Sequence, residues 1–129
     1  MPSIIFGHLG KDMHPSERKF WNAFFLGQEI EACFHLYPTQ PHDIPLRLSE
    51  MFLHDRRGYT IGAELGSAMT DCMDVLDVSA KKTGKVDTVF NDGGVIKGFD
   101  FSLLSAEGRS RKRLQVWKMS DPKLHKNSS

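Results

Sequence analysis

The sequence contains little cysteine and no paired cysteine motif. Only two of its 129 residues are cysteines, Cys33 and Cys72, and no C-x-x-C spacing occurs. Secreted disulfide scaffolds of this size normally carry more cysteines at tighter spacings. We therefore expect an intracellular protein in which both thiols are reduced and behave as small hydrophobic side chains.

Long apolar runs are also missing. The longest, Ala23 to Leu26, has four residues, whereas a membrane span needs about 18 or more. The N-terminus has no basic segment followed by an apolar stretch, so a secretory signal is not expected. The sequence therefore predicts a cytoplasmic protein with one domain over residues 1–119 and a frayed polar tail at 120–129.

The common catalytic and nucleotide-binding signatures are absent. The chain has no G-x-x-x-x-G-K-[ST], G-x-G-x-x-G, H-E-x-x-H or G-x-S-x-G sequence. We therefore expect no cofactor, no metal and no catalytic residue. One alternative stays open, a small enzyme, with or without a metal, built from dispersed His, Asp and Cys residues. A cavity lined by His35, His42 or His54 would favour that alternative.

Hydrophobic periodicity predicts an α+β fold in a single domain. Alternating and β-rich segments predict strands at residues 3–9, 29–36, 86–90, 95–103 and 114–119. Apolar residues at helical spacing predict helices from about 12 to 27, from 46 to 54 and from 60 to 81. The turn residues Asn91-Asp92-Gly93-Gly94 predict a tight hairpin. The order β-α-β-α-α-β-β-β predicts a mixed sheet of about five strands with the helices packed on one face.

Charge is balanced over the whole chain but not along it. There are 17 Lys and Arg residues against 16 Asp and Glu, yet residues 109–129 contain seven basic residues and one acidic residue. The predicted C-terminal hairpin would carry the basic cluster Arg109, Arg111, Lys112, Arg113 and Lys118 together with Trp117. Guanidinium groups beside an aromatic ring suit a phosphate or carboxylate ligand. The alternative is a charged edge strand that prevents association between sheets.

An acidic segment precedes this basic one. Residues 61–80 contain four acids and no base, namely Glu64, Asp71, Asp74 and Asp77. On the predicted helix over 60–81 these carboxylates would form a second surface that binds a cation or a basic partner, or that limits nonspecific binding. The alternative is the solvated face of an amphipathic helix.

Together these features favour a non-enzymatic binding module. Its basic hairpin would dock an acidic protein surface, a nucleoprotein or a nucleic acid, as in inhibitors and adaptors of the kind that phages and mobile elements encode. No membrane contact is expected. The identity of the partner and the oligomeric state stay open.

Overall fold

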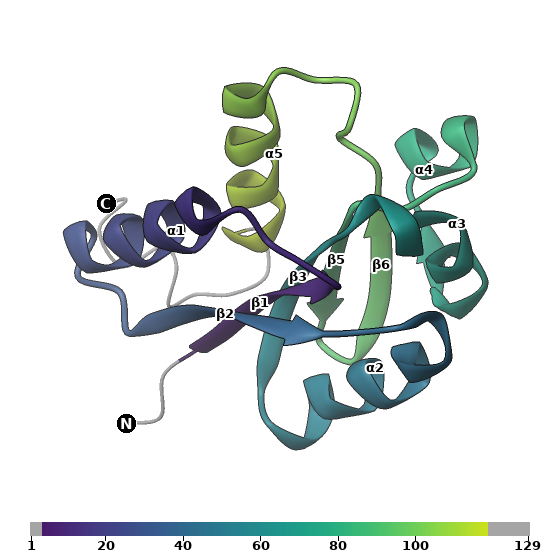
Figure 1. The fold of residues 1–129 in the computed structure, drawn as a ribbon, viewed down its shortest axis with the longest axis horizontal. Coiled ribbons are helices and arrows are strands. Elements are labelled where there is room, and N and C mark those ends of the chain that lie inside the picture. The colour runs from purple at the N-terminus through teal and green to yellow at the C-terminus, as the bar shows by residue number, and fades with distance from the viewer. Residues whose placement is uncertain (1–3, 119–129) are drawn as a thin grey trace.

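A computed structural model describes residues 4–118 and shows a six-stranded mixed sheet between helices (Figure 1). The order across the sheet is β2-β1-β3-β5-β6-β4. The strands are β1 (Ile4–Gly10), β2 (Ala32–Pro38), β3 (Arg56–Ile61), β4 (Val75–Leu76), β5 (Thr88–Asp92) and β6 (Val95–Phe99). Strand β5 is antiparallel to both of its neighbours, and the other pairs are parallel. The predicted mixed sheet is confirmed, with six strands rather than five.

The helices cover both faces of this sheet. On one face lie α1 (Pro15–Gly27) and α5 (Ala106–Lys118), and on the other lie α2 (Ile44–Leu53), α3 (Gly66–Met69) and α4 (Val78–Thr83) (Figure 1). Short 3-10 turns complete the chain: η1 (Pro41–Asp43), η2 (Ala63–Leu65) and η3 (Thr70–Cys72). The expectation that all helices share one face is wrong. Strand β1 is apolar on both sides, and a strand of that kind is buried under two layers.

Two separate cores result from this layering. The core under α1 and α5 is mainly aromatic and includes Phe6, Trp21, Phe25, Phe34 and Trp117. The core under α2, α3 and α4 is mainly aliphatic and includes Leu9, Ile44, Met51, Leu65 and Met69. Gly58 on β3 makes room for the first core, because a Cβ atom there would collide with the indole ring of Trp117.

The predicted long helix over residues 60–81 is wrong. Ile61, Leu65 and Met69 do enter one core, as their spacing suggested, but they do so from β3, η2 and α3 in turn. Residues 56–61 are extended because they pair with β1 on one side and β5 on the other. Pairing between distant segments has here overridden a local helical pattern.

The predicted C-terminal hairpin is also wrong, because residues 106–118 form α5. The Ser105 hydroxyl accepts a hydrogen bond from the Gly108 amide at 3.1 Å, which satisfies a donor in the first turn. Arg113, Val116 and Trp117 are buried at the three- and four-residue spacing of a helix. Residue 119 and the tail predicted at 120–129 lie outside the described residues.

Phe25 and Phe20 on α1 offer a matched test of this packing. Phe25 is 1% exposed, whereas Phe20 is 49% exposed. Phe25→Ala should lower the free energy of unfolding by about 3–5 kcal/mol, because it leaves a cavity in the aromatic core. Phe20→Ala should cost far less. Urea unfolding followed by circular dichroism measures both, and equal losses would show that α1 is rotated from the described position.

Candidate functional site

A crevice opens at the carboxyl ends of the parallel strands β1 and β3. The chain leaves β1 toward α1 on one face and leaves β3 toward η2 and α3 on the other. Such a divergence is where open α/β sheets bind ligands. The crevice has a larger chamber of about 300 Å³ and a smaller one of about 160 Å³. Arg109 and residues 61 and 63 line both chambers.

A row of polar side chains crosses three strands, and two of them, His8 and Thr60, line the larger chamber. His8 on β1 lies opposite Thr60 on β3, and Thr60 lies opposite Thr88 on β5. A hydrogen bond of 2.7 Å joins His8 Nδ1 to Thr60 Oγ1. The two residues are 52 positions apart in the chain, so the sheet register alone brings them together.

The imidazole of His8 is held in its neutral form. Burial lowers its pKa below the ordinary value of 6.5, although the negative charges of Glu17 and Glu64 act in the opposite direction. The Asp12 backbone also acts on the ring and raises its pKa. A neutral imidazole can exchange a proton with a ligand hydroxyl.

Glu64 closes the opposite wall of the larger chamber. Its carboxylate accepts a hydrogen bond of 2.9 Å from the Lys11 amide. That bond and one from its own amide lower the pKa of Glu64. Gly10 and Gly62 allow this approach, because a Cβ atom at either position would lie within 3 Å of a Glu64 carboxylate oxygen.

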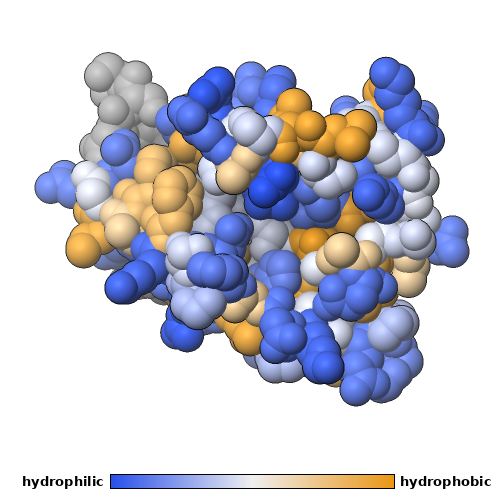
Figure 2. Space-filling model, turned by 45° about the horizontal axis from the view of Figure 1, so that its top comes forward, coloured by the Kyte–Doolittle hydropathy of each residue, from blue (hydrophilic) through white to orange (hydrophobic). Residues whose placement is uncertain are grey.

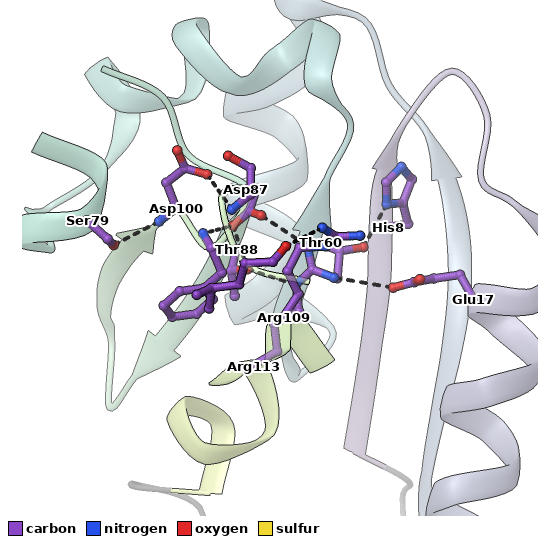
Figure 3. Close-up of polar contacts among 12 residues, drawn as sticks. His8, Glu17, Thr60, Ser79, Asp87, Thr88, Asp100, Arg109 and Arg113 are labelled. Atoms are coloured by element: carbon purple, nitrogen blue, oxygen red, sulfur yellow. Dashed lines mark hydrogen bonds and ion pairs between the residues drawn. The ribbon is translucent and has the colours of Figure 1, made fainter. Parts of the chain in front are cut away.

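Arg113 on α5 clamps the side of the crevice (Figure 3). Its Nε donates to Thr88 Oγ1 at 3.0 Å, and its two terminal nitrogens face Asp87 at 3.3 Å and Glu17 at 3.5 Å. The residue is 8% exposed. A buried charge of this kind is tolerable only when it is fully paired, so Arg113 fixes the positions of β5, α1 and α5.

The smaller chamber contains buried polar atoms without partners. Asp100 and Ser102 line it together with Lys85, Asp87 and Gly66. Asp100 is 6% exposed, and within residues 4–118 no hydrogen bond of good geometry reaches Asp100 Oδ2 or Ser102 Oγ, although the Thr83 and Ser102 hydroxyls lie close enough to help lower the pKa of Asp100. Buried polar groups are nearly always paired in native proteins, so these oxygens are available to a ligand or a water.

The crevice therefore offers hydrogen-bond acceptors and donors at close range and one neutral imidazole. This combination suits a small ligand with several hydroxyl groups. Over residues 4–118, no group of three or more His, Cys, Asp or Glu side chains is arranged to hold a metal ion. No helix in that range is long and apolar enough to cross a membrane.

The predicted basic cluster does not form a single exposed patch. It lies on α5, where Trp117 is 1% exposed inside the aromatic core and Arg113 is buried in the clamp. Arg109 lines the crevice and donates to the Leu104 carbonyl, while Arg111 pairs with Glu107 on the surface. Lys112 and Lys118 complete the cluster on the same helix.

The predicted acidic surface is likewise divided among several elements. Glu64 lies on η2 in the crevice and Asp71 on η3. Asp74 accepts a hydrogen bond from the Ile96 amide, and Asp77 caps α4 through the Ser79 amide. Glu64, Asp74 and Asp77 therefore have local structural roles, and the four carboxylates do not share one helix face.

The histidines singled out from the sequence lie outside the crevice. Neither chamber is lined by His35, His42 or His54. Sequence reasoning missed His8, Thr60 and Asp100, which no motif connects. A polar residue near the end of the first predicted strand was the one local signal, since that is where α/β sheets place functional groups.

A second depression lies between α1 and α5, with a volume of about 410 Å³. Phe20, Phe24 and Leu114 line it, and its polar neighbours Glu107 and Arg111 pair with each other. Figure 2 shows apolar side chains gathered over α1 and hydrophilic ones across the middle of the same face. The groove offers no buried titratable group, so the polar crevice is the better candidate for chemistry.

Comparison with known proteins identifies oxidoreductases as the similar proteins. No protein-family model matches the sequence. The shikimate dehydrogenase (NADP(+)) of Dehalococcoides mccartyi is 26% identical over 101 residues, which span 78% of this chain and 35% of that enzyme. The chain thus spans about a third of the length of the curated relatives it matches.

Solved structures agree with this similarity. Shikimate 5-dehydrogenase from Thermus thermophilus, crystallised with shikimate, is 26% identical with a TM-score of 0.67, covering 75% of this chain and 38% of that one. The 5-ketofructose reductase of a Gluconobacter species has a TM-score of 0.71 at 16% identity, covering 76% and 36%. The described domain therefore has the fold of a shikimate dehydrogenase-like domain.

These comparisons contradict the expected non-enzymatic binding module. The curated relatives and structural neighbours are dehydrogenases or reductases, so an enzyme-like domain replaces the inhibitor, adaptor and phage-protein interpretation. Docking of nucleic acid is unsupported as well. The physical reason is visible in α5, where the two most suggestive residues of the basic cluster, Arg113 and Trp117, are buried.

The neutral state of His8 makes stability depend on pH in a defined direction. Because its folded pKa lies below 6.5, the unfolded chain binds a proton more readily, and the free energy of unfolding should fall as the pH drops below that value. Replacing His8 with Gln should reduce this fall between about pH 7.5 and pH 5. Denaturation at both pH values measures it, with exposed His42→Gln as the control. A larger fall in His8→Gln would contradict a lowered pKa.

Proposed function

We propose that this domain is the substrate-binding part of an oxidoreductase of the shikimate dehydrogenase type. It holds a small polyhydroxylated compound in the crevice at the ends of β1 and β3. The observation that carries the proposal is the convergence of a neutral His8–Thr60 pair with the unpartnered oxygens of Asp100 and Ser102 in one crevice. Similarity to dehydrogenases over 101 residues supports the same reading.

The polyhydroxylated character of the ligand follows from two considerations. The crevice is lined by oxygen acceptors and hydroxyl groups, which recognise hydroxyl hydrogens. The similar proteins are named for shikimate and for 5-ketofructose, which are chemically different but both carry several hydroxyl groups. A hydroxyl group is therefore the feature that their ligands share.

Each side chain has a distinct task in this proposal. Thr60 and Ser102 accept or donate single hydrogen bonds, and Asp100 accepts from a ligand hydroxyl. His8, held by Thr60, is placed to exchange a proton with a ligand hydroxyl. Arg113 acts only through Glu17, Asp87 and Thr88, which it positions.

The described residues do not fit a dinucleotide cofactor. The usual pyrophosphate position is the helix N-terminus that follows the first strand. In this chain Glu17 places a carboxylate in the first turn of α1 and Asp12 precedes it, so a pyrophosphate would meet negative charge. The proposal therefore concerns the substrate and places no cofactor phosphate on this domain.

Binding measurements on the purified chain test the proposal. Isothermal titration calorimetry with shikimate, methyl shikimate, D-fructose and myo-inositol should find at least one ligand, and cyclohexanecarboxylate, which lacks hydroxyl groups, should not bind. Thr60→Val should weaken binding about fivefold, the cost of one hydrogen bond. Thr70→Val is the matched control, because Thr70 bonds the Ser67 carbonyl away from the crevice.

Ser102→Ala provides a second variant if Thr60→Val fails to fold, since the Ser102 hydroxyl has no described partner to lose. It should weaken binding without lowering stability. Absence of binding by all four polyhydroxylated compounds would contradict the proposal. So would equal effects of Thr60→Val and Thr70→Val.

A further inference from the structure

The two chambers of the crevice carry more negative than positive side chains. Five carboxylates line them, and only three cations do: Asp12, Glu17, Glu64, Asp87 and Asp100 against Lys85, Arg109 and Arg113. A ligand in the crevice therefore meets an excess of negative charge, and charge acts strongly there because the walls exclude much of the water.

The most deeply placed cation is already neutralised. Arg113 faces two carboxylates, Glu17 and Asp87, and its Nε donates a hydrogen bond to Thr88. One guanidinium shared between two carboxylates leaves a net negative charge at this wall. Arg113 therefore has no excess positive charge to offer the carboxylate of a ligand.

The other two cations are less well placed to hold an anion. Arg109 is partly exposed at the junction of the chambers and donates to the Leu104 carbonyl. Burial raises the pKa of Asp100, but the nearby Thr83 and Ser102 hydroxyls, the Ser102 amide and the positive charge of Lys85 together hold it below its usual value. Both cations thus face a protein acceptor.

Electrostatics at the floor of the crevice agree with this charge count. Two carboxylates, Glu17 and Glu64, act on the His8 imidazole from within the crevice, against one guanidinium, that of Arg113. Lys11 offsets Glu64 from outside the chambers. Glu17 shares the Arg113 guanidinium with Asp87 and accepts a hydrogen bond of 3.2 Å from Trp21 Nε1, so its negative charge is only partly compensated.

The position of Glu17 also removes the usual receptor for an anion. The N-terminus of an α-helix attracts anions through its free amides and its dipole. In α1 the amide of Ser16 is bonded to His14 Nδ1, and Glu17 lies in the first turn. An incoming carboxylate would meet a like charge where a helix normally provides a positive end.

We propose, on the basis of the function proposed above, that this crevice selects an uncharged polyhydroxylated compound and discriminates against a carboxylate. Glu17 is the specificity-determining residue. The unpartnered acceptor Asp100 Oδ2, on a residue that is more than nine-tenths buried, favours the same ligand class because it requires a donor such as a ligand hydroxyl.

Shikimate and its methyl ester form a matched pair for the test, because they share a ring and its hydroxyl groups and differ in one negative charge. The ester should bind the purified chain about tenfold more tightly than the acid. Added salt at about 0.5 M should strengthen binding of the acid by screening repulsion and leave the ester unchanged. Titration calorimetry measures both constants.

Glu17→Gln should reduce the preference for the ester to about twofold, because it removes one charge and leaves Arg113 paired with Asp87 alone. Glu107→Gln is the matched control on the surface of α5, where its side chain is 85% exposed. It should leave the preference at its original value. An unchanged preference in Glu17→Gln would overturn the role of Glu17.

The outcomes separate this inference from the proposed function. If the acid binds as tightly as the ester or more tightly, the proposed selection of an uncharged ligand is wrong. The proposed function as a substrate-binding domain is then still supported. If neither compound nor the neutral polyols bind, both proposals fail. The salt series on the unmodified protein decides the question even if Glu17→Gln does not fold.

Discussion

The buried guanidinium of Arg113 is the interaction on which the rest of the crevice depends. It lies between α5, α1 and the start of β5, and its nitrogens face Glu17, Asp87 and Thr88. Desolvating a guanidinium is costly unless each partner is in place, so this one residue fixes the distance between two helices and the sheet. Arg109 lies four residues earlier on the same helix face, at the junction of the two chambers.

The sheet supplies the other half of the site. Parallel β1 and β3 end side by side and send the chain to opposite faces, which leaves the crevice between them. Register places His8 beside Thr60, and burial keeps the imidazole neutral. The fold thus provides a concave site, while the chemistry comes from a few side chains. Carboxylates outnumber cations among these side chains, and this excess opposes an anionic ligand.

Local signals in the sequence were sufficient for part of this fold. Helix α1 ends at Gly27 as predicted, α2 lies within two residues of its predicted bounds, and the turn at Gly93 and Gly94 has positive φ at both residues. Local sequence patterns gave wrong predictions where contacts between distant segments determine the structure. The sequence pattern predicts an exposed cluster at Arg113 and Trp117, and it fails because their partners, Asp87 and Gly58, are distant in the chain. The pair His8 and Thr60 was invisible for the same reason.

The most direct test of the account is a chemical-shift map of the isotope-labelled protein titrated with methyl shikimate. If the crevice is the binding site, the largest amide shifts should fall at residues 60–64 and 100–102, and the imidazole resonances of His8 should move with them. The amide resonances of residues that line the apolar groove between α1 and α5 should not shift. Shifts centred on that groove, with the His8 resonances unchanged, would contradict the account.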